Sequence, residues 1–240
     1  MRSFSVDRTG SHIGEGPVPR YGTGPSPCFP APVYTIAVQL LNETYSTTYS
    51  HGRTIVIRDA VDDDLNDITR IYNMAVVVGG STADLTPRNL DQRREWVYSH
   101  NPRNQYPVVV IEVDGKVAGF ASLSKYHARA GYSDITEFSY YVDKAYARQG
   151  LGTMLVDWLV KAATRIGFRI AVCVVFADNV GSTALMHKFG FERYGYLPAA
   201  CCNGTRLLDV AYWYRNLDTH ADGNAADTTE YTTDGNRQGE

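Results

Sequence analysis

Apolar residues recur at a helical spacing in four parts of the chain. Leu151, Leu155 and Leu159 lie four residues apart and predict the buried face of a helix that ends at Gly167, a typical C-cap residue. The same spacing follows the acidic residues 62–64, and it recurs over 89–99 and 179–190. We therefore expect four helices.

Runs of β-branched and aromatic residues predict strands between these helices. The segments YPVVVIEV (106–113) and KVAGFASLS (116–124) flank Asp114-Gly115, a turn pair that joins antiparallel strands. Further strands are expected over 54–58, 135–142, 169–178, 191–197 and 207–214. The order is strand, two helices, three strands, helix, strand, helix and two strands, which indicates an α/β fold with a mixed sheet.

Composition divides the chain into an expected domain, 54–217, and two flanking segments. In the N-terminal extension, 1–53, residues 1–32 are rich in Gly, Pro and Ser, and the C-terminal tail, 218–240, is polar. Both tails are predicted to be disordered. Residues 33–52 hold some apolar side chains, and they either add a strand or stay loose.

Charge and cysteine content exclude several classes of function. The formal net charge of -3 gives no basic surface for nucleic acid. The four cysteines lack paired metal-ligand spacing, so no metal site is expected, and they fit a reducing, cytoplasmic setting. The N-terminus has no apolar signal segment, and no apolar run is long enough to span a bilayer, so we expect a soluble protein without membrane contact.

Two glycines, Gly150 and Gly152, lie where the strand 135–142 gives way to the next helix. First-turn N–H groups have no helical partner, and glycines let an anion approach them, so the pattern predicts a phosphate site. No Lys-Ser or Lys-Thr follows, which excludes a P-loop, and Leu155 replaces the third glycine of a dinucleotide motif. Close packing alone would also explain such glycines.

The strand 135–142 carries a carboxylate, Glu137, in its middle. Period-two alternation places Glu137, Ser139 and Tyr141 on one face. The other face then carries Phe138, Tyr140 and Val142. Glu137 either pairs with a Lys or Arg at the surface or serves chemistry.

Two blocks, ARQGLG (147–152) and DNVGSTALMHKFGF (178–191), resemble the pyrophosphate loop and the following helix of the Gcn5-related N-acetyltransferase (GNAT) superfamily. Four further segments are similar to its phosphinothricin and methionine-sulfoximine acetyltransferase branch: IYNMAV (71–76), RREWV (93–97), TEFSYYV (136–142) and LLDVAYW (207–213). The resemblance covers the whole expected domain. It implies the GNAT fold, a mixed, mostly antiparallel twisted sheet flanked by helices.

The resemblance also implies a reaction. Acetyl-CoA would be the cosubstrate, and its acetyl group would pass by direct attack in a ternary complex to the amino group of a small amino acid or analogue. The branch often pairs subunits, so a homodimer is a further expectation. Two alternatives stay open: acetylation of a peptide or protein, and a CoA-binding module without turnover.

The resemblance assigns roles to individual residues. Glu137 would be the general base, because an amine arrives protonated at neutral pH and only its lone-pair form attacks a thioester. A main-chain N–H near Tyr141 or Val142 would stabilise the oxyanion. The expected CoA-binding residues are Tyr141, Val142, Arg148, Gln149, Gly150, Leu151, Gly152, Thr153, Asn179 and Ser182, and the expected substrate-binding residues are Arg129, Tyr132 and Arg206.

The sequence departs from the family pattern in three places. Ala147 replaces the Arg or Gln that opens the loop, and Arg148 is expected to compensate. Met186 replaces the His or Tyr of the following helix, so His187, one position later, either protonates the CoA thiolate or lies at the surface. In the segment 199–206, two adjacent thiols and small residues replace most basic or aromatic side chains, and Arg206 is the retained charge.

Overall fold

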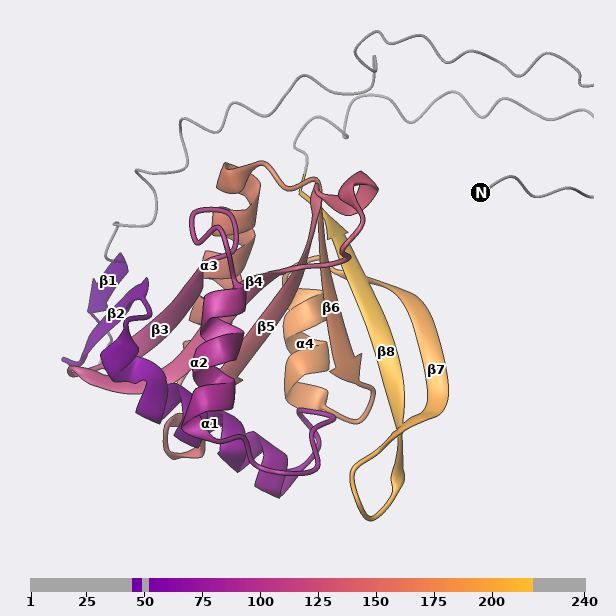
Figure 1. Cartoon of the computed structure of the whole chain (residues 1–240), viewed down its shortest axis with the longest axis horizontal. Helices are drawn as coiled ribbons and strands as arrows, with labels where there is room; N and C mark the ends of the chain where they lie inside the picture. The colour runs from indigo at the N-terminus through magenta and orange to yellow at the C-terminus, as the bar shows by residue number, and fades with distance from the viewer. Residues whose placement is uncertain (1–44, 49–51, 218–240) are drawn as a thin grey trace, which may run out of the picture. The chain divides into compact units, whose positions relative to one another are not determined.

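An eight-stranded mixed sheet forms the centre of the computed structural model, which describes residues 45–48 and 52–217 (Figure 1). The strand order is β1-β2-β3-β4-β5-β6-β8-β7, and every neighbouring pair is antiparallel except β5 and β6. The strands are β1 (Tyr45–Thr48), β2 (Thr54–Asp59), β3 (Val108–Val113), β4 (Lys116–Lys125), β5 (Ile135–Val142), β6 (Ile170–Phe176), β7 (Glu192–Cys202) and β8 (Leu207–Asn216).

Four helices flank this sheet, as the spacing of apolar residues predicts. They are α1 (Leu65–Val78), α2 (Leu90–Ser99), α3 (Leu151–Ile166) and α4 (Val180–Lys188), and short 3-10 turns cover Asp62–Asp64, Ala130–Tyr132 and Lys144–Tyr146. The expected fold class and order of elements are confirmed. Among the described residues, no helix combines the length and the apolar composition that crossing a bilayer requires.

The strand β1 adds one element to the expected domain. It pairs with β2 from Tyr45–Ile57 to Thr48–Thr54, so part of the segment 33–52 forms an edge strand. The first of the two alternatives for that segment therefore holds over 45–48. The predicted tails, 1–32 and 218–240, lie outside the described residues, and the outer bounds of the domain stay a prediction.

The core has one layer on each face of the sheet. On one face, Ile68 and Ile71 of α1 pack with Phe120 of β4, and in Figure 1 α1 and α2 lie in front of the strands. On the other face, Leu155 and Leu159 of α3 are fully buried. Burial of each such leucine contributes about 1.5–3 kcal/mol, so the apolar stripe of α3 fixes that helix on the sheet.

The two faces of β5 follow the predicted alternation. Phe138, Tyr140 and Val142 pack into the layer with α3 and α4. Tyr141 packs into the opposite layer, where its ring stacks on Phe120 with centroids 5.1 Å apart. Glu137 shares the face of Tyr141, because residues four positions apart on a strand point the same way.

Candidate active site

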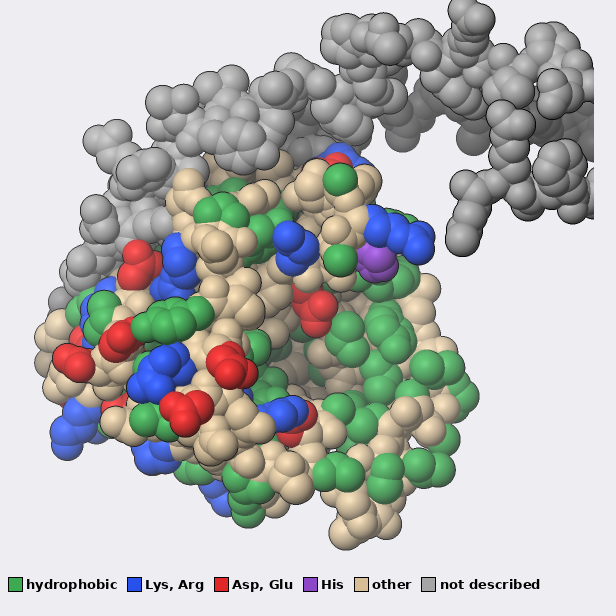
Figure 2. All heavy atoms as spheres, viewed as in Figure 1, with side chains coloured by type: hydrophobic (Ala, Val, Ile, Leu, Met, Phe, Trp, Pro, Cys, Tyr) green, Lys and Arg blue, Asp and Glu red, His purple; other side chains and the backbone are tan. Residues whose placement is uncertain are grey.

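The strands β5 and β6 lie side by side over only part of their length. Their parallel pairing joins 135–137 to 170–172, although β5 extends to Val142 and β6 to Phe176. Beyond these pairs the strands part, and a cavity of about 780 Å³ lies in the opening. Figure 2 shows the hollow on the face that carries α1 and α2, with hydrophobic side chains along its β7–β8 side.

Main-chain groups on the edge of β5 face this opening. In an antiparallel pair, every second residue bonds to the partner strand. The N–H of Asp143 donates to the carbonyl oxygen of Ala118 at 2.8 Å, so Tyr141, two residues earlier, also bonds to β4. The N–H groups of Tyr140 and Val142 therefore point toward the cavity. Of the two predicted main-chain donors, Val142 faces the opening and Tyr141 does not.

The start of α3 presents a second set of free N–H groups. The first helical hydrogen bond runs from the Met154 N–H to the Gly150 carbonyl oxygen at 3.1 Å, so the N–H groups of Leu151, Gly152 and Thr153 have no helical partner. All three residues line the cavity. Gly150 precedes the helix with φ of +84°, a left-handed conformation that favours glycine. The loop therefore offers an anion site at the mouth of the cavity.

The neighbouring residues of this loop differ in what they contribute. Arg148 lines the cavity, is exposed and makes no ion pair within the described residues. A side chain at Gly152 would approach Leu185 Cδ1 of α4 at 3.3 Å, so this glycine also serves helix packing. Gln149 does not line the cavity, because its Oε1 accepts from Arg53 Nη1 at 3.2 Å. Its expected part in CoA binding stays a prediction.

The start of α4 forms the other wall of the mouth. Asn179 caps this helix, since its Oδ1 accepts from the Ser182 N–H at 3.0 Å. Its Nδ2 donates to the Gly80 carbonyl oxygen at 3.2 Å, which fastens the loop between α1 and α2 to α4. Asn179 and Ser182 both line the cavity, as expected for CoA-binding residues.

Glu137 lies where β5 and β6 begin to part. Its side chain lines the cavity, and it makes no hydrogen bond or ion pair within the described part of the chain. Burial raises the pKa of this carboxyl group above its ordinary value. Glu137 therefore does not form the surface ion pair with a Lys or Arg that was the alternative to a chemical role.

Comparison with known proteins identifies this arrangement. A model described as the Acetyltransferase (GNAT) family matches residues 65–191. An L-methionine sulfoximine/L-methionine sulfone acetyltransferase of Salmonella typhimurium is 32% identical over 167 residues, which cover 70% of this chain and 97% of that protein. The chain belongs to the GNAT acetyltransferase family.

Further relatives agree with this assignment. A phosphinothricin N-acetyltransferase of Streptomyces viridochromogenes is 31% identical, covering 70% of this chain and 91% of that protein. The structure of a GNAT phosphinothricin acetyltransferase from Sinorhizobium meliloti, solved with acetyl-CoA, matches with a TM-score of 0.66 at 30% identity, over 74% of this chain and 96% of that one. The protein is an acetyl-CoA-dependent N-acetyltransferase.

A cluster of tyrosines that the sequence analysis missed lies beside Glu137 in this acetyltransferase. Tyr194 is the extra residue of a β-bulge in β7, between Arg193 and Gly195, and bulges re-aim side chains. Burial, together with the neighbouring Tyr126 and the charge of Glu137, raises the pKa of Tyr194 to about 12. Nothing in the local sequence marks this bulge, so the tyrosine could not be assigned from spacing.

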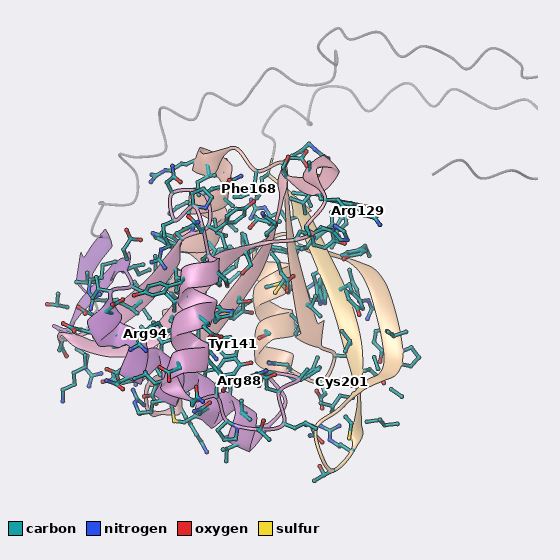
Figure 3. All side chains as sticks on the ribbon, viewed as in Figure 1. Arg88, Arg94, Arg129, Tyr141, Phe168 and Cys201 are labelled. Carbon is teal, nitrogen blue, oxygen red and sulfur yellow. The ribbon has the colours of Figure 1, made fainter. Side chains whose placement is uncertain are left out.

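The expected substrate loop joins this cluster. The Tyr132 ring lies 5.8 Å from the Tyr126 ring and 4.9 Å from the His127 ring, centroid to centroid. Arg129 is exposed and makes no ion pair within the described residues, and Figure 3 shows it near the upper end of β8. Neither Arg129 nor Tyr132 lines the cavity itself. Tyr132 is connected to Glu137 through Tyr126 and Tyr194, and Arg129 directly precedes the short turn that holds Tyr132.

Met186 and His187 take opposite places on α4. Met186 is fully buried in the core. His187 is exposed, and its ring meets Trp213 edge-on with centroids 4.9 Å apart. His187 does not line the cavity, so the structure fits the surface alternative and not the catalytic one.

The β7–β8 hairpin holds the remaining expected substrate residue outside the cavity. Arg206 forms an ion pair with Asp178. Cys202 is exposed and Cys201 is half-buried, and Figure 3 shows Cys201 at the end of the sheet opposite Arg129. None of the three lines the cavity, and the substrate role of Arg206 stays a prediction.

Proposed function

We propose that this acetyltransferase acetylates the α-amino group of a small amino acid or analogue of the methionine sulfoximine or phosphinothricin type. The observation that carries the proposal is Glu137, a half-buried and unpaired carboxylate at the point where β5 and β6 part. Relatives named for those two substrates share about a third of their residues with this chain. The proposal therefore rests on the site and on the family together.

Acetyl-CoA would bind along the opening, from the first turn of α3 at the mouth of the cavity (the α3 mouth) toward Glu137. Its diphosphate would accept from the N–H groups of Leu151, Gly152 and Thr153, beside the Arg148 guanidinium. Its pantetheine arm would lie against the edge of β5, where the main chain of Tyr140 and Val142 is free, and against the capped start of α4. The described residues fit this cosubstrate because each stretch of the cavity offers donors that the protein does not use itself.

Glu137 would accept a proton from the ammonium group of the substrate, directly or through water. Its raised pKa makes it a better base than an exposed glutamate. The freed amine attacks the acetyl carbonyl carbon, and the Val142 N–H would donate to the developing oxyanion. No covalent intermediate on the enzyme is needed.

Arg129 and Tyr132 would hold the other end of the substrate. An unpaired guanidinium in this loop suits the α-carboxylate of an amino acid, since guanidinium and carboxylate form two parallel hydrogen bonds. Tyr126 and Tyr194 would form the wall between this charge and Glu137. The substrate would thus lie with its carboxylate outward and its amino group toward the cavity.

The first test is release of CoA thiol from acetyl-CoA across a panel of amino acids, methionine sulfoximine, phosphinothricin and short peptides, with CoA binding measured in parallel. Turnover with a small amino acid or analogue is the expected result. Turnover with peptides alone would favour the peptide acetyltransferase alternative. Tight CoA binding without any turnover would favour the non-catalytic one.

A second test concerns the carboxylate. Arg129→Ala should raise KM for the amino acid about 10- to 100-fold, the usual effect of losing a hydrogen bond between charged groups. KM for the corresponding amine without a carboxylate should not change. Arg94→Ala, which removes a half-buried arginine paired with Asp91 on α2, is the matched control. Equal effects on both substrates would remove Arg129 from the site.

A further inference from the structure

The Tyr140 hydroxyl group makes no hydrogen bond of normal geometry within the described residues, although the Ser182 side chain lies near enough to lower its pKa. Five buried side-chain polar atoms make no hydrogen bond among the described residues: Arg93 Nε, Ser122 Oγ, Tyr140 Oη, Thr183 Oγ1 and Trp213 Nε1. Of these residues, Tyr140 alone lines the cavity between β5 and β6. A buried donor without an acceptor costs free energy of folding, and phenylalanine would fill the same space without that cost. The hydroxyl group therefore points to a bound molecule as its partner.

The place of Tyr140 in the strand indicates which part of that molecule it meets. Along β5, Tyr140 lies between Glu137, where the amine reacts, and Val142, toward the α3 mouth. Its side chain points to the layer with α3 and α4, opposite Glu137, and it approaches Ser182 at the start of α4. The pantetheine arm would enter from the start of α3, so the sulfur would lie on that side of the acetyl carbon, beside Tyr140, while the amine attacks the carbonyl face near Glu137.

We propose that the Tyr140 hydroxyl group donates a hydrogen bond to the sulfur of CoA and stabilises the thiolate as it leaves. This proposal rests on the proposed direction of CoA in the opening. In the transfer, the C–N bond forms and the C–S bond breaks, and the electron pair of the C–S bond stays on sulfur. Glu137 takes the first ammonium proton before attack and passes it to solvent, and it then takes the second proton that the nitrogen loses as the amide forms. The released thiolate takes up a proton from solvent.

The surroundings of Tyr140 suit a donor that stays protonated. Burial is the largest cause that raises the pKa of Tyr140 well above its usual range, with smaller contributions from Cys173 and Tyr141, and Ser182 opposes it. The hydroxyl group therefore keeps its proton near neutral pH, and it acts by hydrogen bonding. Met186, one turn after Ser182 on α4, is buried and has no proton to offer.

The experiment compares the parent enzyme with Tyr140→Phe in the binding of CoA and of desulfo-CoA, which lacks the sulfur. The preference of the parent for CoA over desulfo-CoA should increase as pH rises and the thiol ionises. The pKa of the bound thiol, measured from thiolate absorbance, should be lower than that of free CoA. Tyr140→Phe should return the bound thiol toward the pKa of free CoA. It should also lower kcat about 10- to 100-fold, as expected for a hydrogen bond to a charged group.

A second readout separates this role from a structural one. Tyr140→Phe should leave the Tm of the free protein unchanged or raise it, since the variant removes an unpartnered buried hydroxyl group. Tyr98→Phe, which removes an exposed hydroxyl group bonded to Asp62, is the matched control and should leave the thiol pKa and kcat unchanged.

Two outcomes would overturn the proposal. One is that the thiol of CoA bound to the parent enzyme has the same pKa as the thiol of free CoA. This measurement needs no variant. The other is an equal loss of affinity for CoA and desulfo-CoA in Tyr140→Phe, which would place the hydroxyl group on the pantetheine arm. Both measurements are made without the amine. A result against Tyr140 is therefore independent of whether the amine substrate has been identified.

Discussion

The β5–β6 opening and the β7–β8 hairpin use paired strands in opposite ways. β5 and β6 pair over three residues each and then part, which leaves main-chain donors facing a cavity. β7 and β8 pair over almost their whole length, with bulges, and most side chains of β7 are exposed. In the opening, main-chain N–H groups are therefore free to bind a ligand. In the hairpin, the main-chain groups bond to one another and stabilise the two strands.

This difference explains which expected residues reach the site. A residue beside the opening, such as Val142 or Ser182, meets the cavity because the strands or helices around it end there. Arg206 and Cys202 belong to the β7–β8 hairpin, whose paired strands have no cavity beside them at these residues. Tyr194 is the exception, because the bulge turns it out of the regular alternation and toward Glu137.

The largest expected effect is the loss of the base in the opening. Glu137→Gln should lower kcat about 100- to 10,000-fold, because general base catalysis contributes on that order. CoA affinity should not change, since Glu137 makes no contact at the α3 mouth. Glu192→Gln, at an exposed glutamate in β7, is the matched control. Full activity of Glu137→Gln would refute its assignment as the base.

The second effect compares two glycines that both have a positive φ. Gly150→Ala and Gly204→Ala both force alanine into a left-handed conformation, with φ of +84° and +92°, and each should lower stability by about 1–2 kcal/mol. Gly150→Ala alone should also weaken CoA binding. If distortion of the anion-binding loop costs about 1.4 kcal/mol of binding free energy, the dissociation constant for CoA rises about tenfold. Titration calorimetry and urea unfolding measure the two quantities. Equal CoA affinity in both variants would contradict an anion site at the α3 mouth.

A third effect is the dependence of stability on pH. The raised pKa of Glu137 means that the folded state holds this proton more tightly than the unfolded state does. Its contribution to stability is present below the ordinary glutamate pKa and is lost as pH rises through the folded-state pKa. The parent should therefore lose stability relative to Glu137→Gln across that window, in urea unfolding at a series of pH values. A difference that stays constant with pH would show that burial does not shift this group.

The smallest expected effect lies in the hairpin. Arg206→Ala removes an exposed ion pair with Asp178, where the side chains are 60% and 44% accessible, and such pairs contribute at most about 1 kcal/mol. KM for the amine and kcat should stay within twofold of the parent, on the order of 0.4 kcal/mol. A large rise in KM for the amine would instead bring the hairpin into the substrate site.

Sequence patterns were informative wherever a local rule decides the structure. The stripe of leucines in α3 and the Asp114-Gly115 turn follow from side-chain spacing and backbone preference, so these elements are where they are expected. The loop at Gly150 was predicted for the same reason. Gly152 illustrates the limit, because its contact with Leu185 depends on how two helices pack.

Candidate side chains were harder to place than elements. A helix turns by about 100° per residue, so the choice between Met186 and His187 depended on the rotation of α4 against the sheet. Only the packed structure buries the first and exposes the second. Tyr126 and Tyr194, which are far apart in the sequence, meet because a strand end and a bulge bring them together.

By itself, the sequence determined the order of helices and strands, the glycine turn before α3, the two faces of β5 and the resemblance to the GNAT family. Each depends on residues that are near neighbours in the chain. The tertiary structure decided how far β5 and β6 separate, which main-chain groups this leaves free, and that the hydroxyl group of Tyr140 is buried beside the cavity. These features depend on contacts between distant segments, which no local pattern encodes.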